Sequence, residues 1–314
     1  MIDLSNTTLR ICLPIISDRI SALDAGEVLT LRVADPDHCV GCYAGSTYRY
    51  KEQDFVHRSW HSWSTLAHLL HCRISTPRAQ KDGSAIVNLY KLDTANSFHT
   101  NSGYDTDGIF ARIDKLEEPD FLHHYALALR EAKIHDKRSL LDLGAHDGTE
   151  LSAIRDLMPD AHIEMTGIDI EYSAIEHARS LDIPRCRFHH HDINQLDSLG
   201  LDRFDLILSI ATLQSPSIET KPLIMNLTQN YLHKDGAFII AYPNSRWIDG
   251  ELITGAKAPN YRYNESSLLI KDIYWIKKYL QQHRFRVRIF GQSYIWIVAT
   301  RILDPKPTID SSKK

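Results

Sequence analysis

A loop bracketed by two glycines and rich in acidic residues is the segment of this sequence best suited to ligand binding. It reads Leu141-Asp142-Leu143-Gly144-Ala145-His146-Asp147-Gly148. Glycine tolerates positive φ and lets backbone N–H groups approach a ligand, so Gly144 and Gly148 favour a tight turn before a helix. Asp169 follows Gly148 by 21 residues and closes a second apolar run, where a carboxylate can accept both hydroxyls of a ribose. The pattern predicts a site for a nucleoside-containing ligand.

The loop differs from the phosphate-binding turn of dinucleotide folds. Those folds use G-x-G-x-x-G and hold a pyrophosphate at a helix N-terminus. This loop reads G-x-x-x-G, with His146 where a middle glycine would stand, and its acids Asp142 and Asp147 repel phosphate. A cofactor with a positive sulfonium, an amine and a ribose fits better. A nucleotide-cofactor oxidoreductase is the less favoured alternative.

Strand-length apolar runs alternate with helical segments around this loop. The expected strands are 139–143, 163–168, 187–190, 204–210 and 237–242, and the expected helices are 150–157, 173–180, 223–232 and 267–282. Strict alternation of this kind is typical of a parallel sheet covered on both faces. In such sheets the ligand lies beyond the carboxyl ends of the strands, where the strand order switches.

The chain ends differently, because strands 286–290 and 294–302 are separated by only three residues. A gap that short permits only an antiparallel hairpin. We therefore predict an α/β fold with a doubly wound, mostly parallel seven-stranded sheet and an antiparallel terminal hairpin. Residues 104–302 would form this domain.

Four ordered segments resemble the motifs of class I S-adenosylmethionine-dependent methyltransferases, a Rossmann-like family. They are LLDLGAHDGTE, GIDIE, HHDI at 190–193 and FDLILSIATLQ. The resemblance implies S-adenosylmethionine as the cofactor and methyl transfer by in-line displacement. It also implies that Asp169 binds the ribose, that Asp192 accepts from the adenine amino group beside Ile193, and that Ser209 lies under the methyl group. The expected cofactor-binding set is Arg112, Asp142, Gly144, Ala145, His146, Asp147, Gly148, Asp169, Ile170, Asp192, Ile193 and Ser209.

Residues 103–118 precede a helix that Pro119 opens. In related enzymes this region forms a lid, so Arg112 is our candidate for the cofactor carboxylate and Tyr104 or Phe110 could cover the sulfonium. An ordinary surface arginine is the alternative.

The acceptor side is defined partly by exclusion. Family members that modify amines and amides carry N-P-P-Y where this chain has Ile210-Ala211-Thr212-Leu213, and no cysteine stands there. Adenine N6, glutamine amide and cytosine C5 acceptors are therefore disfavoured. A 25-residue stretch after strand 237–242 lacks periodicity, and its aromatic and arginine residues suit a planar or anionic acceptor. The predicted acceptor is a small molecule or an RNA nucleotide. The catalytic candidates are Thr212, Gln214, Asn244 and Arg246. A general base could be His146, His190 or His191, and the sequence does not favour one of them.

Net charge and hydropathy argue against two classes of protein, dedicated nucleic-acid binders and proteins with membrane-spanning helices. A net charge of −4 and a pI near 6.5 lack the basic field of a dedicated nucleic-acid binder. Residues 271–301 hold seven Lys and Arg against Asp272 alone, either as a solvated face or as a patch for RNA or a phosphorylated acceptor. No run approaches the roughly 20 apolar residues of a membrane span. Five cysteines and no signal-peptide pattern favour a cytoplasmic protein with reduced thiols.

Residues 1–100 predict a small N-terminal α+β region of unknown role, with strands at 27–33 and 85–92 and a helix at 60–71, and residues 303–314 predict a disordered tail. Cys39, Cys42, His57 and His61 have zinc-finger spacing, but Asp54 replaces the finger's leucine, so no metal site is predicted and the question stays open. An inactive methyltransferase-like adaptor is the remaining alternative, because His146 departs from the family's usual glycine.

Overall fold

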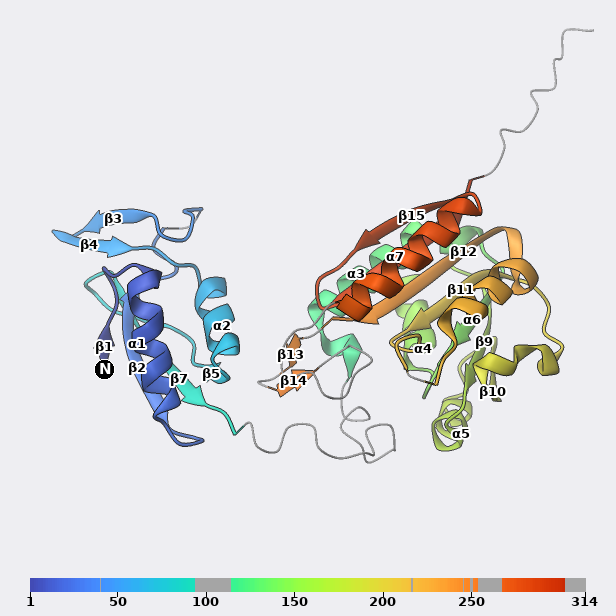
Figure 1. Cartoon of the computed structure of the whole chain (residues 1–314), viewed down its shortest axis with the longest axis horizontal. Coiled ribbons are helices and arrows are strands. Elements are labelled where there is room, and N and C mark those ends of the chain that lie inside the picture. Colours follow the sequence, from blue (N-terminus) through green and yellow to red (C-terminus); the bar gives the residue numbers. More distant parts are fainter. Residues whose placement is uncertain are drawn as a thin grey trace, which may run out of the picture. The chain divides into compact units, whose positions relative to one another are not determined.

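The chain forms two compact units in the computed structural model, which describes residues 1–39, 41–93, 114–215, 217–244, 246–248, 251–253 and 267–302. One unit comprises Met1–Thr100 with Trp247–Ile253, and the other comprises Asn101–Arg246 with Thr254–Lys314. Figure 1 labels most of the helices and strands of both units. The predicted domain limits at residues 100 and 104 and the predicted tail 303–314 lie outside the described residues.

The first unit is a small α+β structure, as the sequence predicts. Its sheet has the order β1-β2-β7-β5, and β6 also pairs with β7. The strands are β1 (Ile2–Asp3), β2 (Val28–Ala34), β5 (Cys72–Ile74), β6 (Arg78–Ala79) and β7 (Ser84–Lys91), and the helices are α1 (Leu9–Ser21) and α2 (Trp60–Leu69). A separate hairpin joins β3 (Thr47–Tyr50) to β4 (Gln53–Val56). The sequence analysis missed α1, because Pro14 interrupts its pattern; its buried residues Cys12, Ile16 and Ile20 nevertheless complete the core.

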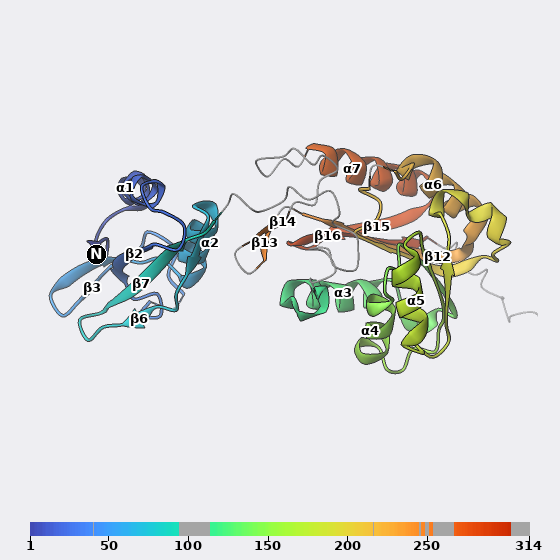
Figure 2. The same ribbon diagram turned by 90° about the horizontal axis from the view of Figure 1, so that it is seen from below.

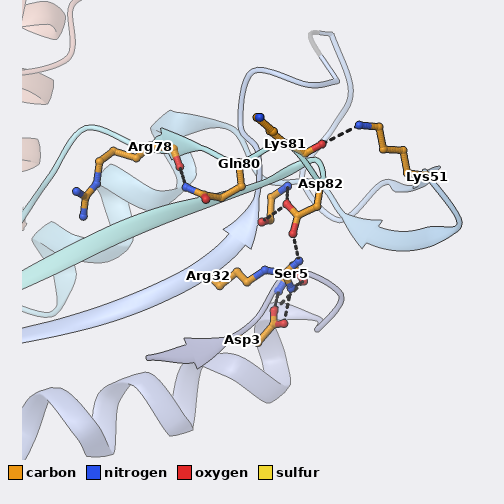
Figure 3. A network of polar contacts seen from close by, with 9 residues as sticks. Asp3, Ser5, Arg32, Lys51, Arg78, Gln80, Lys81 and Asp82 are labelled. Atoms are coloured by element: carbon orange, nitrogen blue, oxygen red, sulfur yellow. Dashed lines mark hydrogen bonds and ion pairs between the residues drawn. The ribbon is translucent and has the colours of Figure 1, made fainter.

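A network of charges centred on Arg32 fastens this sheet at one end (Figure 3). The Arg32 guanidinium contacts the carboxylate of Asp3 and lies 2.8 Å from Oδ2 of Asp82. The Ser84 hydroxyl and amide donate to the other oxygen of Asp82. Hydrogen bonds from Ser84 and Arg32 hold the pKa of Asp82 well below its usual range. The network links β1, β2 and the start of β7, so its role is structural.

The second unit is built on a seven-stranded sheet of order β10-β9-β8-β11-β12-β16-β15. The strands are β8 (Ser139–Leu143), β9 (Glu164–Asp169), β10 (Cys186–His190), β11 (Phe204–Ile210), β12 (Leu232–Pro243), β15 (Phe285–Phe290) and β16 (Tyr294–Arg301). All pairs from β10 to β12 are parallel, and β16 pairs antiparallel with both β12 and β15. The predicted fold class is confirmed.

Helices cover both faces of this sheet (Figure 2). The helices α3 (Pro119–Glu131), α4 (Thr149–Leu157) and α5 (Tyr172–Ser180) lie on one face, and α6 (Thr220–Asn226) and α7 (Ser267–Gln282) lie on the other. Each face has its own core of buried apolar side chains. Short 3-10 helices span Lys115–Glu117, Ile134–Asp136 and Ile193–Leu199, and β13 (Arg246–Ile248) pairs with β14 (Glu251–Ile253). Every helix in the described part is too short or too polar to cross a bilayer.

The structure corrects the limits of one helix and one strand. The predicted helix 223–232 is α6 followed by a π-helical turn at Leu227–Tyr231, and β12 begins at Leu232 rather than 237. Leu232 pairs with Phe204, and the register then shifts, so that Ala237 pairs with Leu206. The intervening His-Lys-Asp-Gly is typical of a turn in the sequence, and only pairing with β11 extends the strand through it.

Candidate functional site

The glycine loop between β8 and α4 has a backbone that other residues would not adopt readily. Gly144 has a φ of +80° and Gly148 a φ of +77°. A Cβ atom on Gly144 would lie 2.1 Å from Oγ1 of Thr212, at the end of β11. Since β8 pairs with β9 on one side and β11 on the other, the loop lies at the point where the strand order switches. The structure thus brings Gly144 and Thr212 together, as the two predicted motifs require.

Asp169 at the end of β9 fixes this loop. Its Oδ2 accepts from the amide of His146 at 2.9 Å, and its Oδ1 accepts from the amide of Glu171 at 2.8 Å. The amides of Gly144 and Ala145 donate to the carbonyl of Ile168. Each oxygen of a carboxylate can accept a second hydrogen bond. Asp169 can therefore order the loop and still accept hydroxyl groups from a ligand.

Ionisable side chains are buried or half-buried beneath the loop. Two of them, Glu150 and Lys115, are not among the site residues predicted from the sequence. Asp142 is 3% exposed and Glu150, in the first turn of α4, is 7% exposed. The ammonium of Lys115 forms an ion pair with Glu150, whose carbonyl accepts from the hydroxyl of Tyr125 at 3.0 Å. Lys115 lies within the predicted lid 103–118. A second cationic residue in that segment, beside Arg112, is the sequence signal that could have identified it.

The pKa values of these groups follow from burial and pairing. Burial, and then the nearby Glu150, raise the pKa of Asp142 well above its usual range, while Lys115 opposes this. Burial favours a lower pKa for Lys115, but Glu150 more than offsets it and the pKa is raised. Burial thus disfavours the charged form of Asp142, whereas pairing with Glu150 keeps Lys115 charged.

His146 places an imidazole beside an acid of the loop. It has a φ of +46°, and its Nδ1 lies 3.7 Å from Oδ1 of Asp147. The nearby carboxylate of Asp147 raises the pKa of His146 against the effect of burial. Burial opposes ionisation of Asp147, but contacts with His146 and Thr149 prevail and hold its pKa well below the usual range. The departure from glycine thus introduces a histidine that forms an ion pair with Asp147 when it is protonated.

The predicted adenine-side residues have structural contacts of their own. Oδ1 of Asp192 accepts from the amide of Asn194 at 2.8 Å and so begins the 3-10 helix Ile193–Leu199. Ile193 is 5% exposed and packs in the core, whereas Ile170 is 68% exposed after Asp169. His190 and His191 also have local contacts, with the carbonyl of Ile170 and the hydroxyl of Ser198.

The acceptor-side candidates lie at the ends of β11 and β12. The hydroxyl of buried Ser209 donates to the carbonyl of Leu143, and that of Thr212 donates to the carbonyl of Ile210. Nε2 of Gln214 donates to the carbonyl of Ala211 at 2.6 Å, and its buried Oε1 has no hydrogen-bond partner in the described part. Asn244 is fastened to the β15–β16 turn through Gln292 and Ser293. Arg112 and the side chain of Arg246 lie outside the described residues, as do Tyr104 and Phe110.

The described residues contain no group of three His, Cys, Asp or Glu side chains placed to hold a metal ion. Of the four residues with zinc-finger spacing, His57 is buried and Cys42 is exposed. The acidic side chains at the carboxyl ends of the strands instead suit an organic cation. Asp142 near the end of β8, Asp147 in the loop and Asp169 at the end of β9 bring carboxyl groups and backbone N–H groups to one place.

Comparison with known proteins agrees with this chemistry. Residues 134–285 match the model of a protein family described as a methyltransferase domain. No curated protein sequence matches the chain.

Three solved structures are similar at low identity. The plantazolicin methyltransferase BpumL, in complex with a triazolic desmethylPZN analogue and SAH, is 20% identical with a TM-score of 0.45, over 60% of this chain and 88% of that chain. The methyltransferase domain of bacterial CtHen1 is 15% identical with a TM-score of 0.43, over 59% and 98%. A precorrin-6y C5,15-methyltransferase from Geobacter metallireducens GS-15 is 11% identical with a TM-score of 0.40, over 57% and 88%. Similarities this weak say nothing about the acceptor of this chain.

Proposed function

We propose that this chain, whose residues 134–285 belong to the class I methyltransferase family that uses S-adenosylmethionine, methylates a small molecule or an RNA nucleotide by in-line displacement. The observation that carries the proposal is the glycine loop at the switch point, closed by the carboxylate of Asp169. The alternative of a nucleotide-cofactor oxidoreductase is not favoured by the family match. A cytoplasmic location belongs to the same proposal, supported by five free thiols.

The residues of the loop fit the cofactor by charge and shape. When bound, the cofactor supplies an electrophilic methyl group on a positively charged sulfur. Asp169 would accept the ribose hydroxyls with the lone pairs that the loop amides leave available. Asp147, ionised because its pKa is lowered, favours a nearby cation. Lys115 is the described cation of the lid segment, and together with Arg112 it is the candidate for the cofactor carboxylate.

The acceptor chemistry is argued from Gln214. Its Nε2 donates to the carbonyl of Ala211, which can only accept, so the orientation of the amide is fixed. Among the residues that the structure describes, its Oε1 is then a buried acceptor without a donor, a condition that costs free energy. An O–H or N–H group of the methyl acceptor would satisfy it. Thr212, Asn244 and Arg246 remain proposed neighbours of the acceptor.

Asp169→Ala tests the cofactor site. Loss of the charged hydrogen bonds should weaken binding of S-adenosylmethionine by about tenfold to a hundredfold, measured by calorimetry. Asp202→Ala, which removes an exposed acid away from the loop, is the matched control and should bind normally. Unchanged affinity in a folded Asp169→Ala protein would remove the cofactor assignment.

Gln214→Leu tests the acceptor side. This variant should keep its affinity for S-adenosylmethionine and lose about tenfold in kcat/KM for the acceptor. Transfer of a labelled methyl group into the small-molecule or the RNA fraction of a cell extract identifies the class of acceptor. Normal turnover by Gln214→Leu would separate Gln214 from the acceptor, and equal loss of cofactor binding would assign it to the cofactor instead.

A further inference from the structure

A cavity of the methyltransferase unit lies at the amino ends of the parallel strands, on the opposite side of the sheet from the glycine loop. It has a volume of about 670 Å³ and is open to solvent. Its lining comes from the start of β12, from the residue before β11, from the end of β16 and from the segment after α7. Pockets for small ligands commonly measure about 300–1,000 Å³. The cavity therefore has room for a ligand of nucleotide size.

The side chains around this cavity are mainly cationic or able to become so. They are Arg203, His233, Lys234, His283 and Arg301, and Asp235 is the one carboxylate among the described lining residues. None of the five cationic or protonatable groups forms an ion pair within the described residues. These five groups outnumber the single carboxylate of Asp235, and a bound anion would relieve the repulsion among those that are charged.

Hydrogen bonds orient the guanidinium groups of Arg203 and Arg301, although Arg203 is exposed to solvent. The Nη1 of Arg203 donates to the carbonyl of Leu232 at 2.8 Å, and that of Arg301 donates to the carbonyl of His283. The guanidinium of Arg301 lies 4.2 Å from the ring centroid of Phe285, and its buried Nε has no partner in the described part. A guanidinium that is already oriented binds phosphate with little further loss of entropy.

The backbone at the cavity is also unusual. Thr228 and Gln229, which line it, belong to the π-helical turn Leu227–Tyr231. Such turns are rare and are found frequently at functional sites. The register shift between β11 and β12 lies beside it and brings His233 and Lys234 into the lining.

We propose that this cavity binds a phosphate-bearing small molecule of nucleotide size, separately from the cofactor loop. Arginine and lysine supply the charged donors that phosphate oxygens prefer. The acidic glycine loop at the other edge of the sheet repels the same ligand, so the two sites select opposite charges.

The test uses calorimetry on the full chain with inorganic triphosphate and with ATP as probes. We expect at least one of them to bind, and Lys234→Gln and Arg203→Gln each to weaken that binding by about tenfold. Lys234 is exposed and forms no side-chain hydrogen bond or ion pair with the described residues, so Lys234→Gln keeps the test valid if Arg203→Gln disturbs β12. Lys278→Gln, an exposed change on α7 outside the cavity, should bind the probe normally.

Other outcomes would overturn the proposal. The absence of binding by both probes would do so, as would an equal loss in Lys278→Gln, which would indicate diffuse surface charge. Binding that is lost in Asp169→Ala but kept in Lys234→Gln would move the probe to the cofactor loop. Salt-sensitive binding of a single-stranded RNA, reduced alike by all three Lys and Arg changes, would indicate a nucleic-acid surface instead.

Discussion

The carboxyl ends and the amino ends of the parallel strands in the seven-stranded sheet carry side chains of opposite charge and are built differently. At the carboxyl ends of the parallel strands, the carboxylate of Asp169 fixes the glycine loop, which carries ionised Asp147, and Lys115 forms an ion pair with buried Glu150. At the opposite edge, Lys234 lies in solvent, and Arg203 and Arg301 contact carbonyl groups rather than carboxylates. One parallel sheet can thus hold a cation site and an anion site, because strand direction separates them by the length of the strands.

The largest expected effect comes from removing one partner of the ion pair between Lys115 and Glu150, at the carboxyl ends of the strands. Lys115→Met leaves Glu150 unpaired and buried near Asp142, and should cost about 3–5 kcal/mol in the free energy of unfolding, measured with urea. Lys234→Met removes the matched exposed cation at the other edge and should change stability by less than about 0.5 kcal/mol. The double change Lys115→Met with Glu150→Gln should recover much of the loss. Equal costs for the two single lysine changes would contradict the contrast in burial.

A second test concerns the backbone of the cofactor loop. Gly144→Ala combines a positive φ with a Cβ placed against Thr212, and should cost about 2–4 kcal/mol and abolish cofactor binding. Gly200→Ala is the control, since Gly200 also has a positive φ but no atom within 4 Å of a new Cβ. The control should lose only about 1–2 kcal/mol from backbone strain. A Gly144→Ala protein that still binds S-adenosylmethionine would show that Thr212 moves aside without consequence.

The smallest expected effect depends on pH. The pKa of His146 is raised by Asp147, so its stabilisation is complete below the ordinary histidine value near 6.5 and disappears as the pH rises through the raised pKa. The difference in unfolding free energy between the wild type and His146→Gln should be less than about 1 kcal/mol at pH 6, since the pair is partly exposed, and should fall toward zero at alkaline pH. A difference that grows with pH would reverse the sign of this assignment.

Much of the methyltransferase fold was predictable because its signals are local. The apolar runs at Ser139–Leu143 and Phe204–Ile210 have the limits found for β8 and β11, and helix α7 begins and ends where its periodicity does. The three-residue gap before β16 correctly predicted the antiparallel hairpin. The start of β12 was wrong because pairing with β11, rather than local composition, extends that strand.

The amino-acid sequence by itself determined the order of strands and helices, the glycine positions of the loop and the acids that end its strands, since backbone geometry and apolar period act between near neighbours. Only the tertiary structure decided that Lys115 pairs with Glu150, that Thr212 closes on Gly144 and that Arg203 shares a cavity with Arg301. These contacts join residues far apart along the chain. Whether a side chain is buried, paired or left without a partner depends on how distant elements pack together, and local sequence patterns do not predict that packing.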